Sequence, residues 1–182
     1  MPERPYGVRE PDRDNVAAMR AESLPRALLQ GLAAGAAGTT ALNAVTYLDM
    51  AIRGRPASTT PDRTVEYLAA RVGVNIPGEG DERSNRLSGL GAFGGACTGL
   101  AVGAALSAAR FVSKPQSALA TGLIGTTGAL LVANGPMIAA GITDPRDWSA
   151  ADWIADLVPH LAFGLVAGWV LDRLDHPEHR RT

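Results

Sequence analysis

Stretches without charge alternate with charge-dense stretches along this chain. Segments of 22 or so largely uncharged residues are long enough to cross a hydrocarbon core of roughly 30 Å as helices. The second and third of these segments show no polar face over several turns, which a soluble amphipathic helix would need. The pattern therefore predicts an all-α, polytopic membrane protein with four transmembrane helices. The predicted spans are residues 27–50, 87–109, 116–140 and 150–171.

The long first connection has a helical pattern of its own. Thr60-Pro61-Asp62 is typical of an N-cap followed by the first helical turn. Val65, Leu68 and Val72 then recur at helical spacing. This predicts a short amphipathic helix over about 61–73, which lies on the membrane surface or caps the bundle. A solvated connector and a docking helix for a partner are the two interpretations of its role.

Local signals mark the ends of the later segments. Asn134-Gly135-Pro136 is expected to break or end the third segment. Ser149 with Asp152 three residues later predicts an N-cap with a variant of the capping box. Tryptophans flank the fourth segment near both ends, at the depth that indole rings prefer. They are Trp148, Trp153 and Trp169.

The bulk composition changes this picture little. Hydrophobic residues make up 46% and the mean hydropathy is only +0.04, because the charged tails, 1–26 and 173–182, and the first loop offset the spans. A net charge of -1 gives no case for a nucleic-acid partner. Cys97 is the only cysteine, so no internal disulfide is possible, and it is expected to be a small buried thiol.

The distribution of arginine and lysine predicts the orientation. With four spans, both tails and the turn at 110–114 share one side, which carries more basic residues than the other. This places both termini in the cytoplasm and the chain in a bacterial inner membrane. Arg53 and Arg55, directly after the first span, argue the other way.

A row of glycines with a spacing of four is the sharpest motif. It consists of Gly91, Gly95, Gly99 and Gly103 and is continued by Ser107. Lipid gives helices no hydrophobic reason to associate, and glycine lets two backbones approach closely. We call this row the glycine zipper and interpret it as a packing face. Its partner is a second copy, another membrane protein, or one of two pairs within the chain: Gly31 with Gly35, and Gly164 with Gly168.

A polar stripe follows one face of the fourth segment. Asp152, Asp156 and His160 are spaced by four, and Pro159 frees the carbonyl of Ala155. Ionisable groups at membrane depth are a functional hypothesis by default. The stripe has a structural role near the helix start, relays protons, or binds a divalent metal ion.

The first segment carries polar residues at its far end. Thr39, Thr40, Asn43 and Tyr47 lie on roughly one face, which ends near Asp49. The candidate polar or ion site consists of Asn43 and Asp49 with Asp152, Asp156 and His160. In the predicted topology, Asp49 shares a side with Asp152 and with the arginines after the first span. Arginine–carboxylate pairs at this end of the bundle have one of two expected roles: they hold the helices together, or they form part of a small polar pocket.

No enzyme signature is present in the sequence. The glycine-rich runs follow no predicted strand and precede no correctly placed lysine, and there is no Gly-x-Ser-x-Gly motif. No cysteine–histidine metal set exists, and His176 and His179 lie in the charged C-terminal tail. We therefore expect a protein that is not an enzyme and that holds no cofactor and no metal.

The layout of the chain resembles that of small four-span bacterial membrane proteins of unknown function, including the YagU-like inner-membrane group. The shared features are a glycine-rich first span (residues 31–38), a long polar first connection, a short second one, and an acid four residues before a histidine, here Asp156 and His160. The acid is aspartate instead of glutamate, and Pro159 intervenes. The resemblance implies no particular activity.

Two functions follow as expectations. The first is an oligomeric or accessory subunit of a membrane complex, with the lipid bilayer and a copy of itself or another membrane protein as partners, packed through the glycine zipper. The second is a small transporter or proton- or ion-conducting protein that uses the polar stripe.

Overall fold

The described part of the chain, residues 13–112 and 116–175 of a computed structural model, is helical and contains no strand. The predicted all-α class is thus confirmed. The outer tail residues, including His176 and His179, lie outside the described part. The helices are α1 (Arg13–Arg53), α2 (Thr60–Arg71), α3 (Gly80–Val112), α4 (Ala118–Ala139) and α5 (Ala150–Asp175), with a short 3₁₀ turn, η1 (Pro145–Asp147), before α5.

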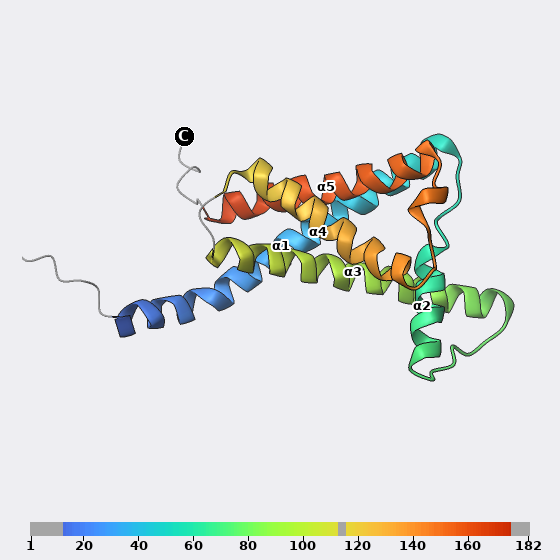
Figure 1. The fold of residues 1–182 in the computed structure, drawn as a ribbon, viewed down its shortest axis with the longest axis horizontal. Helices are drawn as coiled ribbons and strands as arrows, with labels where there is room; N and C mark the ends of the chain where they lie inside the picture. Colours follow the sequence, from blue (N-terminus) through green and yellow to red (C-terminus); the bar gives the residue numbers. More distant parts are fainter. Residues whose placement is uncertain (1–12, 113–115, 176–182) are drawn as a thin grey trace, which may run out of the picture.

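Four of the helices run along the long axis of the molecule in alternating directions, and α2 crosses α3 near its N-terminal end (Figure 1). Helix α1 packs against both α3 and α5, whereas α4 packs mainly against α5. The largest fully buried side chains are Phe163, Leu171 and Thr121. The buried core is small and rich in alanine, because these helices approach one another through small residues.

Three described helices, α3, α4 and α5, are long and apolar enough to cross a membrane. This indicates a multi-pass membrane protein. Helix α1 contains the first predicted span and is long enough, but it is not among the three. Alanine, glycine and the polar side chains around Thr39 and Asn43 lower its apolar character. The fourth span therefore stays a prediction, as does the membrane-surface position of α2, in which no residue is buried.

Two local expectations are wrong. Helix α4 continues through Asn134, Gly135 and Pro136 and ends at Ala139, so these residues form its last turns instead of interrupting it. Proline so close to a helix end removes only one late hydrogen bond, from Pro136 to the carbonyl of Val132. Cys97 is exposed on α3, because no other helix covers that part of α3.

The predicted N-cap of α5 is confirmed. Ser149 Oγ accepts a hydrogen bond from the backbone N–H of Asp152 at 3.2 Å, and the Asp152 carboxylate accepts from the Ser149 N–H at 2.9 Å. These reciprocal bonds satisfy donors that the first turn leaves without helical partners.

Removal of this cap should destabilise the protein measurably. We expect Ser149→Ala to lower the free energy of unfolding by about 1 kcal/mol, as measured by denaturant titration of the detergent-solubilised protein. Thr40→Ala is the control, because the exposed Thr40 hydroxyl bonds only the carbonyl of Ala36 in its own helix. Equal effects of the two substitutions would contradict the role of the cap.

Candidate functional site: glycine contacts and a polar bridge between α4 and α5

The C-terminal half of the glycine zipper lies directly against α1. A Cβ added at Gly31 would lie 2.7 Å from the Cα of Ala104, and one added at Gly35 would lie 2.5 Å from the carbonyl oxygen of Gly99. A Cβ at Gly103 would in turn lie 2.5 Å from the Cα of Gly35. Backbone atoms cannot move aside as side chains do, so this contact between α1 and α3 requires glycine on both helices.

The second glycine pair packs against α4 instead of α3. A Cβ at Gly168 would lie 2.6 Å from the backbone nitrogen of Gly122, and Gly164 faces Gly122 and Thr126. Sequence reasoning missed Gly122 as a packing residue. The signal was present, because Gly122 and Thr126 repeat the spacing of four between small residues.

The N-terminal half of the zipper has a different environment. A Cβ at Gly91 would lie 2.9 Å from the Cβ of Pro61 in α2, whereas Gly95 has nothing within 4 Å. Gly89 and Gly94 are equally open. The zipper is thus divided, and only its C-terminal half is occupied by contacts with α1.

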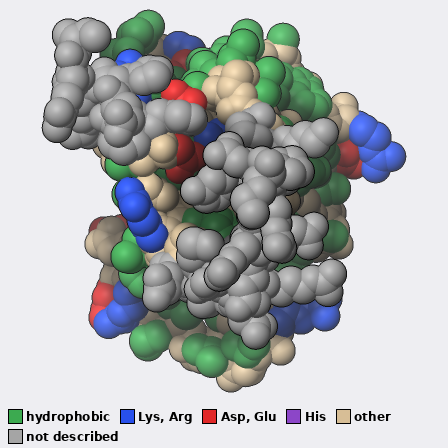
Figure 2. Space-filling view, turned by 90° about the vertical axis from the view of Figure 1, so that its left-hand side faces the viewer, with side chains coloured by type: hydrophobic (Ala, Val, Ile, Leu, Met, Phe, Trp, Pro, Cys, Tyr) green, Lys and Arg blue, Asp and Glu red, His purple; other side chains and the backbone are tan. Residues whose placement is uncertain are grey.

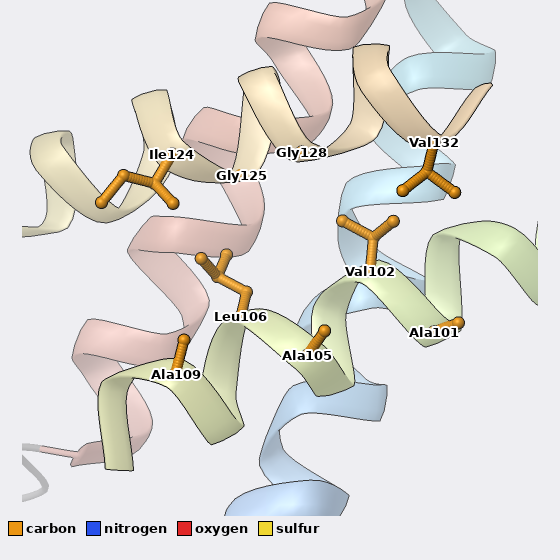
Figure 3. A pocket seen from close by; sticks show the side chains of 9 residues that line it. All are labelled: Ala101, Val102, Ala105, Leu106, Ala109, Ile124, Gly125, Gly128 and Val132. Carbon is orange, nitrogen blue, oxygen red and sulfur yellow. The ribbon is translucent and has the colours of Figure 1, made fainter. Parts of the chain in front are cut away.

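The open part of α3, residues 89–98, is exposed nearly all round. Phe93 is 68% exposed and Leu90 45% exposed. Further along α3, an apolar groove of about 420 Å³ separates it from α4, and the side chains of Val102 and Val132 face each other across it (Figure 3). The groove is lined by Ala101, Val102, Ala105, Leu106 and Ala109 of α3 and by Ile124, Gly125, Gly128 and Val132 of α4.

Two members of the polar stripe, Asp156 and His160, form a polar cluster with Asn134 of α4. The Asn134 amide donates through Nδ2 to the Asp156 carboxylate at 2.9 Å. His160 Nδ1 lies 2.7 Å from the backbone oxygen of Asp156 and 3.5 Å from its carboxylate. The side chains of His160 and Asp156 are 13% and 20% exposed. The cluster therefore bridges α4 and α5 in a largely covered position, and Asn134 is the partner that sequence reasoning missed.

The other candidate polar residues do not join this cluster. Asp152 is exposed and belongs to the cap at Ser149. Asn43 is exposed on α1. Asp49 pairs with Arg55 at 2.5 Å and with Arg53 at 3.6 Å, which is the predicted arginine–carboxylate pairing.

Within the described ranges, no three carboxylate, imidazole or thiol side chains come together as a metal site. The described residues therefore do not form the three-ligand metal site considered from the stripe.

A second polar cluster closes the opposite end of the bundle. Arg110 of α3 pairs with Asp175 of α5 through Nη2 at 2.8 Å and donates to the carbonyl oxygen of Gln116 and to the Thr121 hydroxyl of α4. The Arg110 side chain is only 10% exposed. Figure 2 faces this end and shows basic and acidic side chains around its edge. Arg110 therefore connects three helices where they emerge from the apolar part of the bundle.

The loop before α5 carries an exposed ion pair. Arg146 hydrogen-bonds the carboxylate of Asp144 and holds the pKa of that carboxyl below its ordinary value. The Arg146 side chain is 88% exposed, so solvent screens the pair and its contribution to stability is small.

Comparisons with known proteins identify no family for this chain. The chain matches no family model, no curated protein and no solved structure. The resemblance in layout to YagU-like proteins therefore stays an expectation.

Proposed function

We propose that this protein is a subunit of a membrane complex, and that a transmembrane helix of a second copy or of another membrane protein packs on residues 89–98 of α3. The observation that carries the proposal is the division of the glycine zipper. Gly99 and Gly103 are covered by α1, while Gly95 of the same row, and Gly94 beside it, have nothing within 4 Å.

Helix energetics support a partner at this position. Each glycine in a helix interior is about 1 kcal/mol less favourable than alanine, so a glycine-rich stretch gains little from helix formation itself. In the C-terminal half of α3, close packing on α1 compensates for the low helix propensity of glycine. Within residues 89–98, Gly91 packs against Pro61 of α2, and the neighbouring Ser88 bonds Asp62 of α2, whereas Gly94 and Gly95 have nothing within 4 Å. A partner helix would supply there the dispersion contacts that α1 supplies further along.

The groove between α3 and α4 lies further along the same helix. Ala101, Ala105 and Ala109 face the groove at a spacing of four and expose little side-chain bulk. Such a surface lets a helix backbone approach closely, which is the usual basis of helix association in lipid. The open glycines and this alanine row together form the proposed association face.

A single substitution in this face should reduce association without unfolding the chain. We expect Gly95→Leu to lower the associated fraction about tenfold, because a contact of this kind is worth roughly 1–2 kcal/mol. The molar mass in gentle detergent and bis-maleimide crosslinking through Cys97 measure the effect. A mass that is a multiple of the chain indicates self-association, and a co-purifying protein indicates a heteromeric complex.

The matched control is Gly135→Leu, which also places leucine at a helical glycine with nothing within 4 Å but lies on α4. Helical content and thermal stability should be unchanged in both variants. Association that is equally strong in Gly95→Leu and in the unsubstituted protein would refute the proposed face.

A further inference from the structure

Helix α2 lies across the bundle, whereas the other helices run along it (Figure 1). Helices α3, α4 and α5 are apolar enough to cross a membrane, so a helix that runs across them lies along the membrane plane. Helix α2 meets α3 at Ser88 and Gly91, directly after Arg86, the last charged residue before the uncharged run of α3. This is the level at which a spanning helix passes from water into the bilayer.

A tryptophan pair lies at the same end of the bundle. Helix α5 begins on the side where α3 begins, because α4 runs back between them (Figure 1). Trp148 and Trp153 flank this start with their ring centroids 5.0 Å apart, and Trp153 is 40% exposed. Indole rings prefer the membrane–water interface. The pair therefore indicates the interface at the end of the bundle where α2 lies.

Two contacts with α3 show how α2 is turned about its own axis. A Cβ added at Gly91 would lie 2.9 Å from the Cβ of Pro61, so Pro61 lies beside the uncharged run of α3. Glu66 pairs with Arg83 at 2.5 Å, in the charged turns that precede this run. The side of α2 that carries Pro61 is therefore turned toward the apolar part of the bundle, and the side that carries Glu66 is turned away from it.

The apolar side chains of α2 follow the side of Pro61. Val65, Leu68 and Val72 continue from Pro61 at spacings of four, three and four, which places them on one face of the helix. Leu68 is 57% exposed and Val72 is 74% exposed. This apolar face of α2 is thus directed toward the membrane side, and the described helices leave it uncovered.

The charges of α2 are divided in the same way. Its two acids, Asp62 and Glu66, are both bonded to α3. Its two arginines, Arg63 and Arg71, lie on exposed surface, and the Arg71 guanidinium is 5.0 Å from the centre of the Tyr67 ring. A helix with an apolar face toward the bilayer and exposed arginines elsewhere is complementary to phospholipid, which offers acyl chains below a layer of phosphates.

We propose that α2 is an interfacial anchor that binds the surface of the lipid bilayer. Val65, Leu68 and Val72 enter the boundary between headgroups and acyl chains, while Arg63 and Arg71 contact headgroup phosphates. The direction of the apolar face favours lipid over a water-soluble partner, because such a partner would approach α2 from the side that carries Glu66.

Site-specific quenching in the full chain, reconstituted in phospholipid nanodiscs, tests this orientation. In a Cys97→Ser background, Leu68→Cys and Ala70→Cys are each labelled with an environment-sensitive fluorophore. Ala70 is the matched control, because it is also exposed and lies about 200° around the helix from Leu68. We expect brominated acyl chains to quench the label at Leu68 several-fold more than the label at Ala70, and aqueous iodide to quench it several-fold less.

Val72→Cys repeats the measurement one turn further along with Leu68 intact, so that the result does not depend on replacing one member of the apolar face. Equal quenching by iodide at Leu68, Ala70 and Val72 would overturn the proposal. Labels at Leu68 and Val72 that are shielded from both iodide and brominated lipid would also overturn it, because they would show that protein covers this face.

Discussion

A Gly103→Leu chain is expected to lose the packing of α1 on α3 and to be less stable by about 3 kcal/mol. A Cβ at this position would lie 2.5 Å from both the nitrogen and the Cα of Gly35. These are backbone atoms of a long helix, so the clash can be relieved only if α1 moves away as a whole. That movement would also separate Ser107 Oγ from the carbonyl oxygen of Ala27, a buried hydrogen bond of 2.7 Å one turn further along.

The measurement is unfolding of the detergent-solubilised protein, followed by helical circular dichroism. Gly95→Leu is the matched control, because it makes the same change in the same helix and row at a position with nothing within 4 Å. Measured on the dissociated chain, it should unfold at nearly the same denaturant concentration as the unsubstituted protein. Comparable losses of stability in the two variants would contradict the distinction between the packed Gly103 and the open Gly95.

The second large loss of stability is expected when a polar contact is removed, the ion pair of Arg110 with Asp175. Arg110→Met should lower the free energy of unfolding by roughly 2–3 kcal/mol. Methionine preserves much of the apolar stem but leaves the Asp175 carboxylate without its cation and the buried Thr121 hydroxyl without its donor. Asp175 is 36% exposed, which keeps the effect below that of a fully buried pair.

The same unfolding measurement checks this prediction, with Arg146→Met as the control. Arg146 also forms an ion pair, at 2.6 Å, but its side chain is 88% exposed and connects residues only two apart. The control should leave stability nearly unchanged, because solvent screens this pair. If both variants behave alike, Arg110 does not hold the three helices together.

Much of the fold could be predicted from the pattern of charge along the chain. Runs such as residues 87–109 have no charge and no polar face, so they can be stable only as helices in an apolar environment. The cap at Ser149 was equally predictable, because a capping box depends on residues three apart in one turn. The pairing of Asp49 with Arg53 and Arg55 is also local in sequence.

The candidate site was less accessible from the sequence. A spacing of four places Asp152, Asp156 and His160 on one face, but it does not say which of them meets another helix. Asp152 belongs to the first turn of α5 and bonds Ser149, whereas Asp156 meets Asn134 across the bundle. Asn134 had been interpreted only through its neighbour Pro136, although α4 continues past both.

The sequence by itself determined the helical class, the positions of the apolar segments and the spacing of the glycines, because these depend on residues within a few turns of one another. Only the tertiary structure decided which glycines are already occupied. Gly99 and Gly95 are identical in type and belong to the same row, yet one is pressed against α1 and the other is open. The difference arises because α1 and α3 stay in contact along only part of their lengths, and the relative placement of two helices depends on packing between residues distant in the chain.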